Sequence, residues 1–150
     1  MSKPEVIIYT DGACRGNPGP GGWAALLQYN SKEKEISGSE PNTTNNRMEM
    51  MAIIQALKSL KRSCTVCIHT DSALIYNTFT KNWITSWQNK GWKKADKKPV
   101  ENQDLWKMML KEMKHHEVNW VKVKGHSTDE RNNRVDELAV NAAKNLSSPT

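Results

Sequence analysis

The sequence predicts an α/β fold in which helices cover both faces of a mixed β-sheet. Near the N-terminus, a short β-branched and aromatic stretch is followed closely by two further strand-like stretches, which is typical of an antiparallel meander. Two further apolar stretches come later, separated by segments whose apolar residues recur at helical spacing. Because strands that alternate with helices favour parallel pairing, we expect a sheet that contains both strand directions.

The N-terminal part of the chain supplies the predicted meander. Its three strands are expected at residues 6–9, 23–29 and 34–37. The first strand stops at Thr10-Asp11-Gly12, which has the chemistry of a turn, and residues 16–22 are so rich in glycine and proline that they predict a tight loop. A hairpin at Asn30-Ser31 would join the other two strands.

The rest of the chain predicts helices that alternate with strands. Thr44 offers a capping side chain to a helix of about four turns, whose apolar stripe begins at Met50. There follow, in order, a strand at 65–69, a helical stretch containing Trp83, Trp87 and Trp92, a helix at 102–114, a strand at 118–123, a polar loop at 125–133 and a last helix with an apolar stripe from Val135 to Leu146. Residues 147–150 are expected to be a disordered tail.

The composition favours one domain over residues 1–150 that acts on a polyanion. The chain is 37% hydrophobic and 25% charged, and its 22 basic residues against 16 acidic ones leave a net charge of +6. No window approaches the roughly 18 apolar residues needed to cross a bilayer, and no secretory signal is visible, so we expect a cytoplasmic protein without a membrane role. Three cysteines do not make a disulfide framework.

Four acidic residues stand at the ends of predicted elements. Asp11 and Asp71 each end a strand, Glu49 lies early in the helix that Thr44 opens, and Asp136 lies near the start of the last helix. Sites in open α/β sheets gather beyond the carboxyl ends of strands, so these carboxylates can converge. Clustered carboxylates repel unless cations neutralise them, and oxygen ligands suit Mg²⁺ or Mn²⁺. Taken singly, each acid is better explained by a turn or a helix terminus, and it is their joint placement that favours a site.

Several short segments carry a family resemblance. They are residues 9–14 (YTDGAC), 16–23 (GNPGPGGW), 43–49 (TTNNRME), 70–72 (TDS), 120–126 (WVKVKGH) and 136–139 (DELA). In this order they resemble bacterial type 1 ribonuclease H across nearly the whole chain. The resemblance implies a ribonuclease H-like fold with a five-stranded mixed sheet, three strands antiparallel and two parallel. It also implies two-metal-ion hydrolysis of the RNA strand of RNA–DNA hybrids, with little sequence preference.

The resemblance also assigns roles to individual residues. Two Mg²⁺ ions, or Mn²⁺, would bind Asp11, Glu49, Asp71 and Asp136, and His126 would assist proton transfer and product release. The residues implied in substrate binding are Cys14, Asn17, Asn45 and Asn46 for the RNA strand, Thr44 and Asn102 for a DNA phosphate, and Trp83, Trp87, Trp92, Lys93 and Lys94 for the DNA strand. Amides both donate and accept hydrogen bonds, as recognition of a 2′-hydroxyl requires.

Some positions depart from the family pattern, and two other functions stay open. Asn42 and Ala73 replace residues that often contact the substrate, Leu74 replaces an aromatic residue, and Gln88-Asn89 dilutes the charge of the basic segment. A hybrid-binding module with weak catalysis is one alternative, although all four acids are present. A nuclease of the same fold that cuts DNA is the other, which the asparagines disfavour. We expect a monomer, and no protein partner can be inferred from the sequence.

Overall fold

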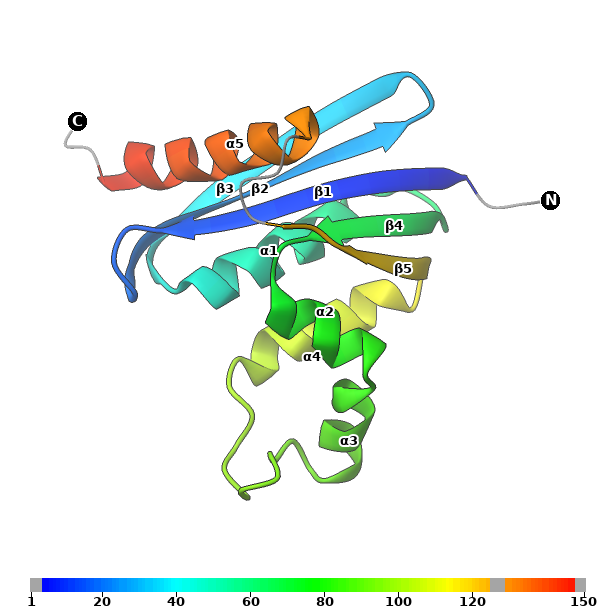
Figure 1. Ribbon diagram of the computed structural model, residues 1–150, viewed down its shortest axis with the longest axis vertical. Coiled ribbons are helices and arrows are strands. Elements are labelled where there is room, and N and C mark those ends of the chain that lie inside the picture. The colour runs from blue at the N-terminus through cyan, green and yellow to red at the C-terminus, as the bar shows by residue number, and fades with distance from the viewer. Residues whose placement is uncertain (1–3, 125–128, 148–150) are drawn as a thin grey trace.

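The computed structural model describes residues 4–124 and 129–147 and contains one five-stranded sheet, in the order β3-β2-β1-β4-β5 (Figure 1). The strands are β1 (Glu5–Cys14), β2 (Gly19–Tyr29), β3 (Lys32–Thr43), β4 (Thr65–Thr70) and β5 (Glu117–Lys122). β1, β2 and β3 pair antiparallel, whereas β4 pairs parallel with both β1 and β5. The predicted mixed sheet, with three antiparallel and two parallel strands, is therefore confirmed.

Helices pack on both faces of this sheet. They are α1 (Asn45–Lys58), α2 (Ala73–Thr80), α3 (Trp83–Asn89), α4 (Gln103–Met113) and α5 (Glu130–Ser147). Figure 1 shows α5 above the sheet, over β1 to β3, and α1, α2 and α4 below it. The strand period of two divides the core accordingly. Ile8 belongs to the cluster shared with α1 and α4, while its neighbour Tyr9 packs with Val135 and Ala139 of α5.

The predicted glycine-rich loop is only partly a loop, because residues 19–22 belong to β2. Gly21 and Gly22 pair with Cys14 and Ala13 of β1. A Cβ at Gly22 would lie 2.2 Å from the carbonyl oxygen of Ala139, so glycine is what allows α5 to rest directly on the strand. The glycines that predicted a loop therefore include one, Gly22, that instead allows close contact between β2 and α5.

Two helical predictions are corrected in the middle and near the end of the chain. The stretch from residue 73 to Trp92 is not one helix, since Asn82 at φ 59° separates α2 from α3 and Trp92 lies beyond α3 at φ 64°. The predicted polar loop at 125–133 is wrong for residues 130–133, which open α5. Asp129 Oδ1 accepts a hydrogen bond from Arg131 N at 2.8 Å and so caps that helix. Residues 125–128 and 148–150 lie outside the described residues, and Ser147 ends α5.

Two further local predictions are confirmed. Thr44 is the N-cap of α1, and its Oγ1 accepts a hydrogen bond from Arg47 N at 3.3 Å. The hairpin between β2 and β3 turns at Asn30 and Ser31, with Asn30 at φ 55°. Across the described ranges, no helix combines the length and the apolar character that a transmembrane span needs.

Candidate active site

The candidate site lies where β4 ends beside β1. The parallel pairing of these strands stops at Tyr9 and His69, and Asp71 follows the last residue of β4. The prediction that Asp11 ends its own strand is wrong, because β1 continues along β2 and pairs Asp11 with Ala24. Asp11 nevertheless stands beyond the end of β4, so both aspartates reach the carboxyl edge of the parallel strands.

Glu49 is brought to this edge by a close contact between β1 and α1. A Cβ at Gly12 would lie 2.5 Å from the backbone nitrogen of Glu49 and 2.6 Å from the carbonyl carbon of Met48. Only glycine lets the second turn of α1 approach the strand so closely. Since Thr44 sets where α1 begins, these two features together place the Glu49 carboxylate beside that of Asp11.

Asp136 reaches the same region on α5. The buried residues Val135 and Ala139 pack α5 against the sheet, and two ion pairs join this helix to β3. Arg131 Nε lies 2.8 Å from Glu33, and Arg134 Nε lies 2.7 Å from Glu35. Asp136 itself is exposed.

The acids share one open depression. One oxygen each of Asp11, Glu49 and Asp71 can be chosen so that all three lie within 4.8 Å of one another. The depression has a volume of about 430 Å³, and it is lined by Asp11, Gly12, Asn45, Asn46, Glu49, Asp71, Ser72, Ala73, Leu74 and Asp136. The structure therefore brings the four predicted acids together, three of them in a tight cluster and Asp136 in the lining.

The electrostatics of the cluster fit a divalent cation. Burial raises the pKa of Asp11 to about 7, and the neighbouring carboxylates Asp71 and Asp136 add to this rise. Burial also raises the pKa of Glu49 well above its usual value, again with a contribution from the charges of Asp11 and Asp71. Glu49 Oε2 is buried without a hydrogen-bond partner among the described residues. Oxygen donors in an acidic cluster that holds an unpartnered oxygen are the ligand set of a hard cation such as Mg²⁺.

Several of the predicted RNA-strand residues gather beside the acids. Asn45 and Asn46 are exposed and line the depression, and Asn17 Oδ1 accepts a hydrogen bond from Asn45 N at 3.2 Å. Cys14 Sγ lies 3.4 Å from the carbonyl oxygens of Gly19 and of Thr43, so the end of β1 contacts the start of β2 and the end of β3. The structure thus places Asn45 and Asn46 in the lining of the depression, with Asn17 in contact with Asn45 and Cys14 in contact with Thr43.

The two predicted phosphate-binding residues, Thr44 and Asn102, are linked by an arginine that the sequence did not single out. Arg47 Nη1 donates to Asn102 Oδ1 at 3.2 Å, and both terminal nitrogens of Arg47 contact the Asp104 carboxylate, at 3.0 and 2.8 Å. The arginine follows Asn45 and Asn46 directly in the motif, but its partners on α4 lie more than fifty residues away. Sequence patterns alone do not reveal such a contact.

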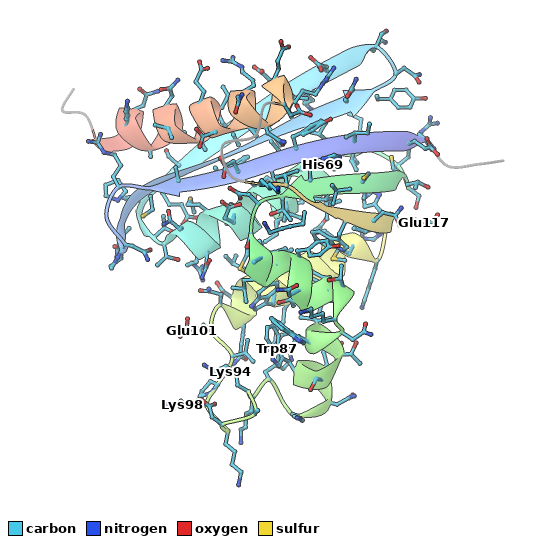
Figure 2. All side chains as sticks on the ribbon, viewed as in Figure 1. His69, Trp87, Lys94, Lys98, Glu101 and Glu117 are labelled. Atoms are coloured by element: carbon cyan, nitrogen blue, oxygen red, sulfur yellow. The ribbon has the colours of Figure 1, made fainter. Side chains whose placement is uncertain are left out.

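The predicted DNA-strand residues lie on the protrusion that α3 and the following loop form below the sheet (Figure 2). Trp83 is exposed, with the Lys81 ammonium 5.9 Å from its ring centroid. Trp87 packs edge-on against Trp106 at 5.5 Å and, like Trp92, is half-buried against the core. Figure 2 shows Lys94 in the outer part of the protrusion, far from the sheet.

These tryptophans therefore differ in their environment, because Trp87 and Trp92 pack against the core whereas the Trp83 side chain is exposed. Lys93, the residue before Lys94, is exposed, and its backbone pairs with Pro99 within the protrusion. His126 lies outside the described residues.

An acidic cluster with oxygen ligands at the edge of a mixed sheet, beside exposed amides and a basic protrusion, defines the class of metal-dependent enzymes that act on nucleic acid phosphodiesters. A family model described as RNase H matches residues 3–144. The chain belongs to the RNase H family, and the resemblance inferred from the sequence motifs is confirmed.

Individual relatives agree with this assignment. The chain is 59% identical to a ribonuclease H of Caldanaerobacter subterraneus subsp. tengcongensis, over 93% of this chain and 91% of the relative. The crystal structure of LC9-RNase H1, a type 1 RNase H with the type 2 active-site motif, superposes with a TM-score of 0.87 at 32% identity, covering 98% of this chain and 75% of that one. LC11-RNase H1, solved in complex with an RNA/DNA hybrid, has a TM-score of 0.73 at 27% identity and covers 95% and 99%.

Proposed function

We propose that this protein is an endonuclease that hydrolyses the RNA strand of RNA–DNA hybrids with little sequence preference. The observation that carries the proposal is the cluster of Asp11, Glu49 and Asp71, whose oxygens lie within 4.8 Å of one another in an open depression. Membership of the RNase H family and the hybrid complex of LC11-RNase H1 support it. The basic net charge of +6 suits a nucleic acid substrate.

We propose that Asp11, Glu49, Asp71 and Asp136 hold two Mg²⁺ ions, with Mn²⁺ as an alternative. When bound, such ions lower the pKa of water and neutralise the charge that develops on the leaving oxygen. Asp11 and Glu49 are the buried ligands in this scheme, and the unpartnered Glu49 Oε2 is free to coordinate. Asp136 is exposed, so it would contribute from the solvent side. A role for His126 in proton transfer stays a prediction.

The hydrogen bonds of two asparagines suggest how they would meet the substrate. Asn17 Oδ1 is occupied by Asn45 N, and Asn102 Oδ1 is occupied by Arg47 Nη1. The side-chain NH₂ group is the donor that each amide would offer, which suits a 2′-hydroxyl oxygen at Asn17 and a phosphate oxygen at Asn102. The proposed substrate set comprises Cys14, Asn17, Thr44, Asn45, Asn46, Trp83, Trp87, Trp92, Lys93, Lys94 and Asn102.

A parallel cleavage assay tests this function. End-labelled RNA–DNA hybrid, duplex RNA and duplex DNA are incubated with Mg²⁺, with and without a chelator, using Asp11→Asn as the inactive control. We expect internal cuts in the RNA of the hybrid only, which the chelator and the substitution abolish. Binding of intact hybrid without cleavage would support the binding-module alternative, and equal cleavage of duplex DNA would support the DNA nuclease.

We also propose that residues 1–150 form a single domain and that the protein works in the cytoplasm. One continuous sheet with helices on both faces supports a single domain. Cys14, Cys64 and Cys67 are free thiols, as is usual in a reducing compartment.

A further inference from the structure

The outer face of α4 carries three lysines that the proposed active site does not use. Lys107, Lys111 and Lys114 recur at intervals of four and three residues, so they lie on one side of the helix, and all three are exposed. They border a depression of about 540 Å³ with Trp92, Leu110 and Met113, three half-buried apolar side chains, and Gln88. We call these three lysines and this depression the α4 groove.

The positive charge of the α4 groove is not neutralised by the acids nearest to it on the helix. Asp104 is engaged by both terminal nitrogens of Arg47, and Glu112 lines a different depression, on the side of the loop that follows α1. None of the ion pairs found in the described part of the chain involves Lys107, Lys111 or Lys114. Three like charges are thus held close together, an arrangement that favours a polyanionic ligand.

The α4 groove is continuous with the basic protrusion through Trp92. The ring of Trp92 lies 5.2 Å below the Lys107 ammonium, and its backbone is fixed by hydrogen bonds to Trp87, Val100 and the Gln103 side chain. Lys93 and Lys94 follow it directly in the chain. One surface therefore runs from the protrusion, which we assign to the DNA strand, onto the outer face of α4.

The length of the lysine row matches the spacing of phosphates. Lys114 is the C-cap of α4, and the seven steps along the helix from Lys107 to Lys114 span about 10 Å at 1.5 Å per residue. One strand of a duplex presents a phosphate about every 3.4 Å along the helix axis, so about three phosphates fit beside the row. Three ammonium groups on flexible stems bind phosphates as point charges and without regard to base sequence.

We propose that Lys107, Lys111 and Lys114 bind the phosphate backbone of nucleic acid that extends beyond the catalytic depression. The inference rests on the proposed function, because the hybrid substrate is what brings a long polyanion to the protrusion. The α4 groove then adds affinity for long substrates and contributes nothing to the chemistry. Its contribution grows with substrate length and falls with salt concentration.

The test compares two triple variants with the same change in charge. Lys107→Gln/Lys111→Gln/Lys114→Gln removes the row, and the matched control Lys32→Gln/Lys34→Gln/Lys61→Gln removes three exposed lysines that border a depression elsewhere on the molecule. Dissociation constants are measured in chelator for hybrids of about 8 and about 30 base pairs between 50 and 200 mM salt. Thermal melting checks that both variants fold.

We expect the α4 variant to lose more affinity for the long hybrid than for the short one. Its log–log salt slope for the long hybrid should be smaller by about 2 to 3, since each lost phosphate contact removes about 0.9, while the control slope changes by less than about 1. Equal slopes for the two variants, or equal losses for both lengths, overturn the proposal. Weakened binding of polyglutamate in the α4 variant with unchanged binding of hybrid would also overturn it and point to an acidic protein.

The proposed function is tested separately, by cleavage of the short hybrid with unsubstituted protein and Mg²⁺. Intact RNA in that assay contradicts the proposed function alone, because the α4 groove is judged by binding and its dependence on length. Cleavage of the short hybrid, together with equal salt slopes for the α4 variant and the control variant, contradicts only the proposed role of the α4 groove.

Discussion

Gly12 of β1 and Glu49 of α1 lie so close that a single methyl group does not fit between them. A Cβ at Gly12 would stand 2.5 Å from the Glu49 backbone nitrogen, well inside van der Waals contact. The glycine that follows Asp11 therefore determines the distance between two of the proposed metal ligands. The acidic cluster depends on a residue that has no functional group of its own.

Gly12→Ala should push α1 away from β1 and separate Glu49 from Asp11. We expect a loss of about 1 to 3 kcal/mol in the free energy of unfolding, typical of an overpacked core. We also expect a loss of at least about 100-fold in kcat, because misplacement by about 1 Å is that costly in a preorganised site. Urea denaturation and hybrid cleavage at saturating Mg²⁺ measure the two effects.

Gly91→Ala is the control for this substitution. A Cβ there meets nothing within 4 Å, although its φ of +69° disfavours alanine. This variant should lose about 1 kcal/mol of stability without a change in kcat at saturating Mg²⁺. If Gly12→Ala behaved in the same way, the close contact would not be what positions Glu49.

The raised pKa of Asp11 predicts a specific dependence of stability on pH. Its value rises from 3.8 to about 7 because the carboxyl is buried and faces other carboxylates. The folded protein therefore binds a proton at the Asp11 carboxyl more tightly than the unfolded chain does. This difference lowers the free energy of unfolding only at pH values at which Asp11 is ionised in the unfolded chain. Without divalent metal, the penalty should be absent below about pH 4, grow up to about pH 7 and remain above it, reaching at most roughly 4 kcal/mol.

Urea denaturation in chelator at several pH values checks this, with Asp11→Asn as the reference. The difference in free energy of unfolding between the two proteins isolates Asp11 from groups with the opposite behaviour. Asp104, for example, has a pKa lowered mainly by its hydrogen bond with Arg47, so its contribution is lost as the pH falls. A difference that stays constant from pH 4 to pH 8 would show that Asp11 titrates normally.

Glu49→Gln should separate the stability of the fold from the binding of metal. The substitution removes one negative charge from a buried cluster while keeping the side-chain shape, so the metal-free protein should gain about 1 kcal/mol at pH 8. Unsubstituted protein should melt at a higher temperature when Mg²⁺ is added, whereas the variant should respond much less.

Scanning calorimetry with and without Mg²⁺ gives both quantities. Glu101→Gln, at an exposed position in the segment before α4, is the matched control and should behave like the unsubstituted protein (Figure 2). An equal rise in melting temperature for all three proteins would mean that the ion binds elsewhere.

The predictions from sequence succeeded where the signal was local. Thr44 indicated the start of α1 through its capping side chain, and strand-like stretches indicated all five strands, although β3 extends well beyond the predicted residues 34–37. Asp11 and Asp71 stood out because each follows an apolar run and a threonine. Asp129 could have been recognised in the same way as the cap of α5, because aspartate is a favoured N-cap residue. In the structure its side chain accepts a hydrogen bond from the backbone N–H two residues later.

The features that sequence reasoning missed depend on contacts between distant parts of the chain. Residues 19–22 read as a loop because glycine and proline are rare in strands, but Gly22 is required by a helix more than a hundred residues away. Asp11 looked like a strand end because only its pairing with β2, and not its local sequence, carries β1 further. Neither contact is visible until the tertiary structure is known.

Arg47 is the third such contact, and it predicts a variant that weakens substrate binding without stopping the reaction. Arg47→Lys keeps the positive charge but cannot reach the Asp104 carboxylate with two nitrogens while also holding Asn102 Oδ1. The Asn102 amide would then lose its fixed orientation toward the proposed phosphate. We expect KM for the hybrid to rise about 3- to 10-fold, equivalent to about 1 kcal/mol, with kcat within about 2-fold.

Steady-state kinetics over a range of hybrid concentrations measure this split between KM and kcat. Arg131→Lys is the matched control, because it weakens a comparable ion pair, with Glu33, on the other face of the sheet. Asp104→Asn should reproduce the effect of Arg47→Lys, since it removes the carboxylate that holds the guanidinium in place. A fall in kcat at unchanged KM in both Arg47→Lys and Asp104→Asn would contradict this prediction. It would show that the contact supports the acidic cluster by positioning α1, and that it does not orient Asn102 toward the substrate.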